Sequence, residues 1–559
     1  MKKLIIILLT VASFRLFAGN EDAVYLKMEK TFILHQDGTI EQRYSHDLKI
    51  LSYYAIHRKY EETVINYNPH FQEIKIHEVS TRLENGKIVR LPANAINEVL
   101  PAEAADAPAY NFLRRLVITH TGIEPNCIIH VDYSLITKNG FFPCLMGNER
   151  IQQSSPVGEL NIKVIVPEQT DLKYDLLNIQ AQPEIVSEKG TRQYEWKFSQ
   201  LKAISEELWQ PAPQVFEPYL IFTTKDLKVV YNEFLNQPAM SFYLSEKARQ
   251  WVEKTKSASK DNLDFIFKVH QYITDYIRTY PLPLNLTGYK IQTPDEVFQN
   301  CGGTRIEKLA LMNAILQSVG IKPVLKLIAP GITKSISSLN IDAFSDCMIE
   351  IMLRGEESRD LTYYADQKDE LSVNQNYGRV VYATYLPLYS GMSTYDPTSC
   401  SDCISIDFQN VNYVKMDEKG YIFSVTSPEN KKLAVVQDTV FKIIRIPWSE
   451  SGMEMWQLPA FVSKRETPVF LPAIRSDNRK IVMEYPSKLR FIGNNTHFFI
   501  ENEAGSFFFD ISKKGKKLII QRKIQFNKQI IEPDSYQKLK ELIAFWQSEK
   551  FNTLYFTGK

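Results

Sequence analysis

The spacing of apolar residues changes twice along this chain of 559 residues. From about residue 20 to 220 apolar and polar residues alternate, as in KIHEVSTRL (75–83), which is typical of half-buried strands. From Thr224 to about residue 320 the apolar residues recur every three or four positions, as in amphipathic helices. Alternation returns after about residue 406. These changes predict a multidomain α+β protein with strand-rich flanks and a mixed helical centre.

The N-terminal flank, residues 19–220, is predicted to be a β-sandwich. Turn dipeptides at Asp37-Gly38, Asn85-Gly86 and Asn139-Gly140 separate its alternating segments. The segment PAEAADAPAYN (101–111) interrupts this pattern and is expected to be a long loop. Seven of the nine histidines lie in this flank, but their spacings match no single metal-binding motif. We therefore expect no metal and no cofactor.

The first eighteen residues have the pattern of a signal peptide. Lys2 and Lys3 precede an apolar run at residues 4–14, and small residues follow at Ala18-Gly19. A membrane anchor or a buried strand is the alternative, but this run is too short to span a bilayer. The residue directly after Ala18 is Gly19, so no cysteine stands at the cleavage site to carry a lipid. We expect an exported, periplasmic protein with no transmembrane segment in the mature chain.

Charge and cysteine usage argue against two functions, nucleic-acid binding and zinc binding. The chain has 66 Lys and Arg against 65 Asp and Glu, a net charge of +1, so it lacks the basic excess of a nucleic-acid binder. Cys400 and Cys403 form a CxxC pair, but the other four of the six cysteines are isolated. A zinc site would need a second ligand pair, so a local disulfide or two free thiols are the simpler interpretation.

The most informative segment is TPDEVFQNCGGTRIEKLALMNAILQSVGIKPVLKL (293–327). Thr304 and Glu307 form a capping box, and Gly320 supplies a helix stop. Helices are also expected at about 227–234, 246–255 and 263–277. Cys301 would then lie just before a buried helix, whose free N–H groups stabilise a thiolate. A small buried cysteine at a strand–helix junction is the alternative.

This segment resembles the core of bacterial transglutaminase-like proteins. The segments 58–96 and 194–207 resemble the β-rich domain of unknown function that precedes such cores, and 530–556 resembles the β-rich domain that follows them. The resemblance implies a transglutaminase-like, papain-like α/β core at 221–405. It also implies a C-terminal β-domain with a terminal helix at 406–559.

Enzymes of that family use a Cys-His-Asp triad in chain order, so the resemblance implies three positions here. Cys301 takes the position of the nucleophile, and Asp346, in FSDCMIEI, stands where the histidine belongs. Asp366, in YYAD, takes the position of the orienting aspartate, and Asp396 is a second candidate. No histidine occurs between Cys301 and His497.

An aspartate in place of the histidine changes the chemistry. Its carboxylate repels a thiolate and is a weak base toward a thiol. Gln299 also replaces the glycine that stands two residues before the family cysteine. His270 could supply another base only if its helix presented this apolar-face residue to the cleft. A disulfide between Cys301 and Cys347 is a further possibility.

Three hypotheses about function follow. The favoured hypothesis is a catalytically degenerate transglutaminase-like protein that binds a peptide or protein segment. The alternative is an active cysteine-dependent peptidase, amidase or transglutaminase that uses Cys301 with an unorthodox base. A structural protein of the cell envelope is a third hypothesis, which only the β-rich flanks support.

Overall fold

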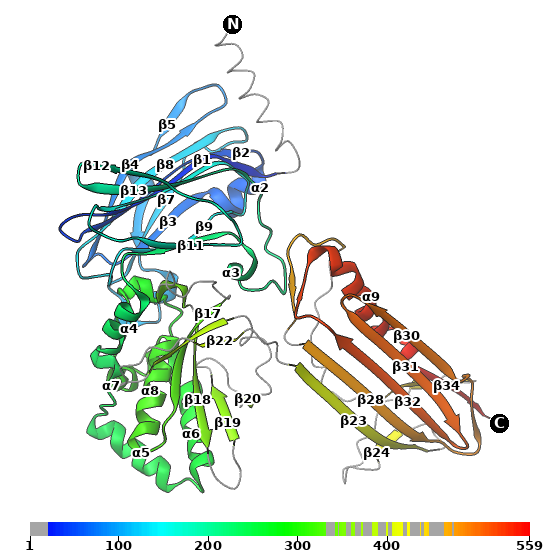
Figure 1. The fold of residues 1–559 in the computed structure, drawn as a ribbon. Coiled ribbons are helices and arrows are strands. Elements are labelled where there is room, and N and C mark those ends of the chain that lie inside the picture. Colours follow the sequence, from blue (N-terminus) through cyan, green and yellow to red (C-terminus); the bar gives the residue numbers. More distant parts are fainter. Residues whose placement is uncertain are drawn as a thin grey trace. The chain divides into compact units, whose positions relative to one another are not determined.

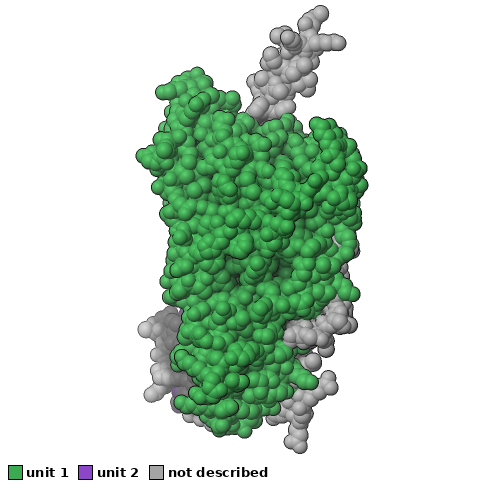
Figure 2. Space-filling model, turned by 90° about the vertical axis from the view of Figure 1, so that its left-hand side faces the viewer, with its two compact units in different colours: residues 1–204, 212–376, 382–400 green, residues 205–211, 377–381, 401–559 purple. Residues whose placement is uncertain are grey.

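The computed structural model describes residues 21–330, 341–344, 346–353, 359–363, 371–372, 383–388, 398–400, 405–417, 422–424, 436–437, 441–446, 463–471 and 474–558. The chain divides into two compact units, and Figure 2 shows mainly the first, in green. The first comprises residues 1–204, 212–376 and 382–400, and the second comprises 205–211, 377–381 and 401–559. The predicted N-terminal domain and the predicted core therefore share one unit, while the segment 205–211 groups with the C-terminal part.

An eight-stranded sheet dominates the N-terminal part of the first unit (Figure 1). Its order is β12-β13-β10-β1-β2-β8-β4-β5, and only β1 and β10 pair in parallel. The strands are β1 (Ala23–Leu34), β2 (Ile40–Ile50), β4 (Gln72–Arg82), β5 (Ile88–Arg90), β8 (Ile128–Thr137), β10 (Val157–Pro167), β12 (Glu184–Glu188) and β13 (Thr191–Leu201).

Two three-stranded sheets pack on this large sheet. Their orders are β11-β14-β9 and β3-β7-β6. Phe32 of the large sheet contacts Phe222 of β14, with ring centroids 5.0 Å apart, and Ile118 of β7 packs in one cluster with Ile129 of β8. The strands are β3 (Glu62–Tyr67), β6 (Ile96–Val99), β7 (Arg114–Thr119), β9 (Met146–Arg150), β11 (Lys173–Leu177) and β14 (Tyr219–Thr223).

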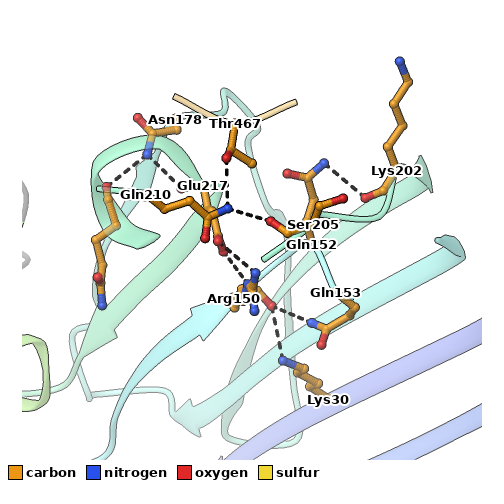
Figure 3. A network of polar contacts seen from close by, with 11 residues as sticks. Lys30, Arg150, Gln152, Gln153, Asn178, Lys202, Ser205, Gln210, Glu217 and Thr467 are labelled. Carbon is orange, nitrogen blue, oxygen red and sulfur yellow. Dashed lines mark hydrogen bonds and ion pairs between the residues drawn. The ribbon is translucent and has the colours of Figure 1, made fainter. Parts of the chain in front are cut away.

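A polar network joins the end of β9 to the segment before β14 (Figure 3). Arg150 donates to the buried Glu217 carboxylate at 2.8 Å, and Asn178 donates to the Glu217 carbonyl at 2.7 Å. Lys30 of β1 donates to the Arg150 carbonyl at 3.3 Å and pairs with Glu149 at 2.7 Å. These contacts connect the small sheet to the large one.

The centre of the chain is helical, as its periodicity predicts. The helices are α4 (Leu227–Leu235), α5 (Glu246–Ser257), α6 (Asn262–Asp275), α7 (Pro294–Asn300) and α8 (Arg305–Ser318). Helix α8 is buried on nearly all sides and packs against α6, α7 and β18. A six-stranded sheet follows in the order β20-β19-β18-β17-β21-β22, with strands β17 (Val324–Pro330), β18 (Asp346–Leu353), β19 (Arg359–Tyr363), β20 (Leu371–Ser372), β21 (Ala383–Leu388) and β22 (Thr398–Cys400).

The segment expected to be a long loop, 101–111, forms two 3₁₀ turns, at Ala102–Ala104 and Pro108–Tyr110. Its small apolar side chains, together with Leu113, pack in one buried cluster with Tyr280 and Leu282 of the helical centre. The segment therefore belongs to the contact between the β-rich part and the helical part of the first unit.

The second unit consists mainly of strands. A six-stranded sheet runs in the order β24-β23-β28-β32-β31-β30, and a four-stranded sheet runs β25-β26-β34-β29. Helix α9 (Tyr536–Gln547) shares a core with the larger sheet. The strands are β23 (Ser405–Met416), β24 (Ile422–Ser424), β25 (Val436–Gln437), β26 (Phe441–Arg445), β27 (Val469–Phe470), β28 (Ile474–Glu484), β29 (Leu489–Phe491), β30 (Thr496–Asn502), β31 (Gly505–Lys514), β32 (Lys517–Phe526), β33 (Ile530–Ile531) and β34 (Thr553–Gly558).

The predicted C-terminal helix is present but is not terminal. Strand β34 follows α9 and pairs with β26 and β29. Its residues read TLYFTG, a short alternating run that completes the four-stranded sheet. Within the described residues, no helix combines the length and the apolar character needed to cross a membrane.

Candidate functional site

A cavity of about 350 Å³ lies at the start of α8. Most of its wall is apolar and comes from the segment between α6 and α7, from the turn at residues 341–344, and from β17 and β18. Four polar side chains interrupt that wall. The apolar lining includes Tyr280, Leu282, Leu284, Leu327, Ile341, Phe344 and Cys347, and the polar lining is Thr279, Thr304, Arg305 and Asp342.

The capping residues fix the first turn of α8. Thr304 is the N-cap residue, and its N–H donates to the Glu307 carboxylate at 2.7 Å, as the predicted capping box requires. Arg305 is therefore the first helical residue. The first N–H groups of a helix have no partner within the helix, so this turn carries a partial positive charge.

Glu307 is a fully buried carboxylate with four donors. Besides Thr304 N–H, it accepts from the backbone and side-chain nitrogens of Gln292, at 2.7 and 3.1 Å, and from the Tyr110 hydroxyl. Burial raises the pKa of Tyr110, and the charge of Glu307 raises it further, so the phenol stays protonated and donates. Tyr110 belongs to the β-rich part, which thus reaches the start of α8.

Cys301 is not at the start of α8. It is the C-cap residue of α7, four residues before Arg305, in the left-handed conformation with φ 49° and ψ 33°. Its exposed thiol donates to the Phe298 carbonyl at 3.7 Å, and its own carbonyl accepts from Arg278 N–H. The expected stabilisation by the N-terminus of a buried helix is wrong, because the carbonyl end of α7 disfavours an anion.

Helix α7 was not predicted, although a local signal for it exists. Thr293 accepts from Glu296 N–H, and Glu296 accepts from Thr293 N–H, which is a second capping box with Pro294 at the first helical position. The seven-residue helix places Gln299 on an exposed turn, where it donates to Asp295 at 2.6 Å.

The other predicted site residues lie in or near the sheet. Asp346 is the first residue of β18 and pairs with Ile328 of β17. Its neighbour Cys347 is 3% exposed and lines the cavity. Asp366 and Asp396 lie outside the described residues, as does Cys403 of the CxxC pair.

Two of the alternatives can be judged from the geometry. Cys301 and Cys347 are both free cysteines, so the proposed disulfide between them is wrong. His270 is 1% exposed and its ring packs against Tyr363, with centroids 4.3 Å apart. It is a core residue of α6, as its position on the apolar stripe predicts.

Asp342 is a site residue that the sequence did not reveal. Its carboxylate accepts from the Tyr289 hydroxyl at 2.6 Å. Burial raises the pKa of Asp342, so its neutral form is favoured more than that of an exposed aspartate. No group of three or more histidine, cysteine or acidic side chains is arranged to hold a metal ion in the described part of the chain.

Comparison with known proteins matches both flanks of the chain. Residues 36–205 match DUF3857 and residues 443–556 match DUF3858, each a domain of unknown function with a solved structure. The predicted resemblance of the flanks to β-rich domains of unknown function is thereby confirmed. No match is found among curated proteins.

Comparison with solved structures gives an extensive match. A crystal structure from Parabacteroides distasonis, described as a candidate protease, is 27% identical with a TM-score of 0.77, over 96% of this chain and 99% of that one. An M1 zinc metallopeptidase from Deinococcus radiodurans matches at 8% identity with a TM-score of 0.20, over 37% of this chain and 43% of that one. This similarity is too low to indicate a shared fold or function. The chain is a bacterial multidomain protein in which DUF3857 and DUF3858 domains flank the segment that carries the cavity.

Proposed function

We propose that this protein is an exported, periplasmic member of the transglutaminase-like group that has lost cysteine catalysis and binds a peptide segment in the cavity at the start of α8. The observation that carries the proposal is the first turn of that helix. A nucleophilic cysteine is expected there, and Arg305 occupies the place.

The local sequence agrees with this assignment. The resemblance requires a glycine two residues before the nucleophile. Gly303 stands two residues before Arg305, whereas Gln299 stands two residues before Cys301. A guanidinium is protonated at every physiological pH and cannot attack a carbonyl carbon. The residue in the nucleophile position is therefore chemically inert.

The histidine and the cysteine of a cysteine enzyme also lack counterparts suited to catalysis. The chain has no histidine between Cys301 and His497, and His270 is buried in the core of the helical part. Cys301 lies beyond the C-terminal end of α7, where the helix dipole opposes a thiolate. A thiol without a base and without a stabilising dipole is a poor nucleophile at neutral pH.

The second candidate is an active cysteine enzyme, and two observations favour it. Cys301 is exposed to solvent, and the extensive structural match is to a protein described as a candidate protease. Under this alternative the exposed thiol would attack an amide, with a base from another part of the chain.

Alkylation of Cys301 by iodoacetamide separates the two functions. We expect Cys301 to be labelled no faster at neutral pH than an ordinary exposed, unactivated cysteine. The Cys301→Ser variant is the control that identifies the labelled residue by mass spectrometry. An activated thiol, with fast labelling already at pH 6, would refute the proposal. So would hydrolysis of a peptide library that the wild type performs and Cys301→Ser does not.

A further inference from the structure

The cavity at the start of α8 also indicates the chemistry of its ligand, an inference that rests on the proposed function. Thr304 is 4% exposed, lines the cavity and faces Glu307 N–H as a capping residue. Its hydroxyl has no hydrogen-bond acceptor among the described residues. A buried hydroxyl proton without an acceptor is costly unless a ligand supplies one. The cavity therefore presents a donor.

The charges around the Thr304 hydroxyl favour an anion. Arg305 follows it in the chain and lines the same cavity. Lys308, one turn further along α8, is buried and donates to the Thr279 hydroxyl at 2.7 Å. The negative charge of Glu307 is already satisfied by four donors.

The rest of the cavity favours a ligand that carries one negative charge on a short apolar group. The Asp342 carboxyl on the same wall would repel a dianion more strongly than a monoanion. The rest of the wall is made mainly of leucine, isoleucine, proline and aromatic side chains. A volume of about 350 Å³ suits a short apolar group and excludes a folded domain.

We propose that this cavity binds the free carboxylate at the C-terminus of a peptide. The carboxylate accepts hydrogen bonds from the Thr304 hydroxyl, from Arg305 and from the first N–H groups of α8, and an apolar terminal side chain fills the rest of the cavity. This is the helix N-terminal mode of anion binding, supplemented by one buried hydroxyl and one cation.

The test is calorimetric titration of the full mature chain with three synthetic peptides. The first is acetyl-Ala-Ala-Phe with a free carboxylate, and the second is the same peptide as its C-terminal amide. The third, acetyl-Ala-Glu-Phe amide, moves the carboxylate to a side chain. We expect the free acid to bind at least about tenfold more tightly than either amide, because a hydrogen bond to a charged group is lost in each.

Substitutions of cavity residues test whether the preference for the free acid over its amide arises in this cavity. Thr304→Val and Arg305→Gln should each weaken binding of the free acid by about tenfold and leave binding of its amide unchanged. Thr304→Ser, which keeps the hydroxyl, should restore the preference. Lys290→Gln, an exposed lysine outside this cavity, is the matched control for loss of a positive charge. Thermal unfolding of each variant verifies that it is folded, and Arg305→Gln leaves the capping pair of α8 intact.

The outcomes distinguish this inference from the proposed function. If acid and amide bind equally, or if the variants weaken both equally, the inference of a carboxylate site is overturned while peptide binding stands. Tighter binding of the side-chain carboxylate would overturn the assignment to a peptide terminus. If none of the three peptides binds, both the inference and the peptide-binding function are overturned.

Discussion

Replacing Tyr110 by phenylalanine should destabilise the first unit, because it removes one donor from a buried carboxylate. Tyr110 is 5% exposed and Glu307 is fully buried, so water cannot replace the lost hydroxyl without opening the cluster. The phenylalanine ring would keep the edge-on contact with Tyr280, whose centroid is 6.1 Å away. The change therefore isolates the hydrogen bond from the packing.

The magnitude follows from the number of donors. Glu307 would retain Thr304 N–H and both nitrogens of Gln292. Hydrogen bonds to charged groups contribute about 1.5–3 kcal/mol each. With three of four donors left, we expect a loss of about 2 kcal/mol in the free energy of unfolding of the first unit.

Urea unfolding measures this loss when it is monitored at the transition in which Tyr110 and Tyr280 become exposed. Tyr280→Phe is the matched control, because it removes a phenol hydroxyl from the same buried cluster that is not one of the four donors to Glu307, and it should change stability by less than about 0.5 kcal/mol. A double-mutant cycle with Glu307→Gln should return a coupling energy of about 1 kcal/mol or more. Equal effects of Tyr110→Phe and Tyr280→Phe would refute the reasoning.

Three further predictions concern other groups. Burial lowers the pKa of His120 to about 4, so the unfolded chain binds a proton at higher pH than the folded one. The part of the stability that depends on His120 should thus fall as the pH drops from about 6.5 toward 4, by about 2 kcal/mol between pH 7 and 5, and His120→Gln should lose about that much less than the wild type in thermal melts over that range. Glu217→Gln weakens the pair with Arg150 and should destabilise the first unit by about 1–3 kcal/mol in urea unfolding, whereas Glu184→Gln, at an exposed pair with Lys197, should change it by less than about 0.5 kcal/mol. The Cys301 thiol should react with iodoacetamide no faster in Arg305→Gln than in the wild type, because Cys301 lies at the C-terminal end of α7 and not at the start of α8. A large change in the rate would contradict this position of Cys301.

Features with a local signal could be predicted from the sequence. The start of α8 depends on Thr304 and Glu307, three residues apart, and Gly320 follows its end. The helices α4, α5 and α6 follow the apolar stripes because period and burial agree. Each of these signals lies within a single helix and its flanking residues, so it does not depend on contacts between distant segments.

The position of Cys301 shows where such reasoning fails. A residue that precedes a buried helix can also end a short helix before it, and the two positions have opposite dipoles. The local signal that distinguishes these two positions is the capping box formed by Thr293 and Glu296, which starts α7. That helix has only seven residues, and the periodicity of its apolar residues is modest. Contacts between distant segments leave no local signal at all: Tyr110 and Glu307 are 197 residues apart.

The Glu307 cluster connects the DUF3857 region to the candidate site. The carboxylate that positions the first turn of α8 takes donors from Tyr110 in the β-rich part and from Gln292 in the segment before α7. Leu113 of the β-rich part also packs in one buried cluster with Tyr280 and Leu282, which line the cavity. A fragment without the β-rich part would therefore expose this cluster and leave Glu307 with one donor fewer. The geometry of the cavity is a property of the whole first unit, and ligand binding should be measured on the intact chain.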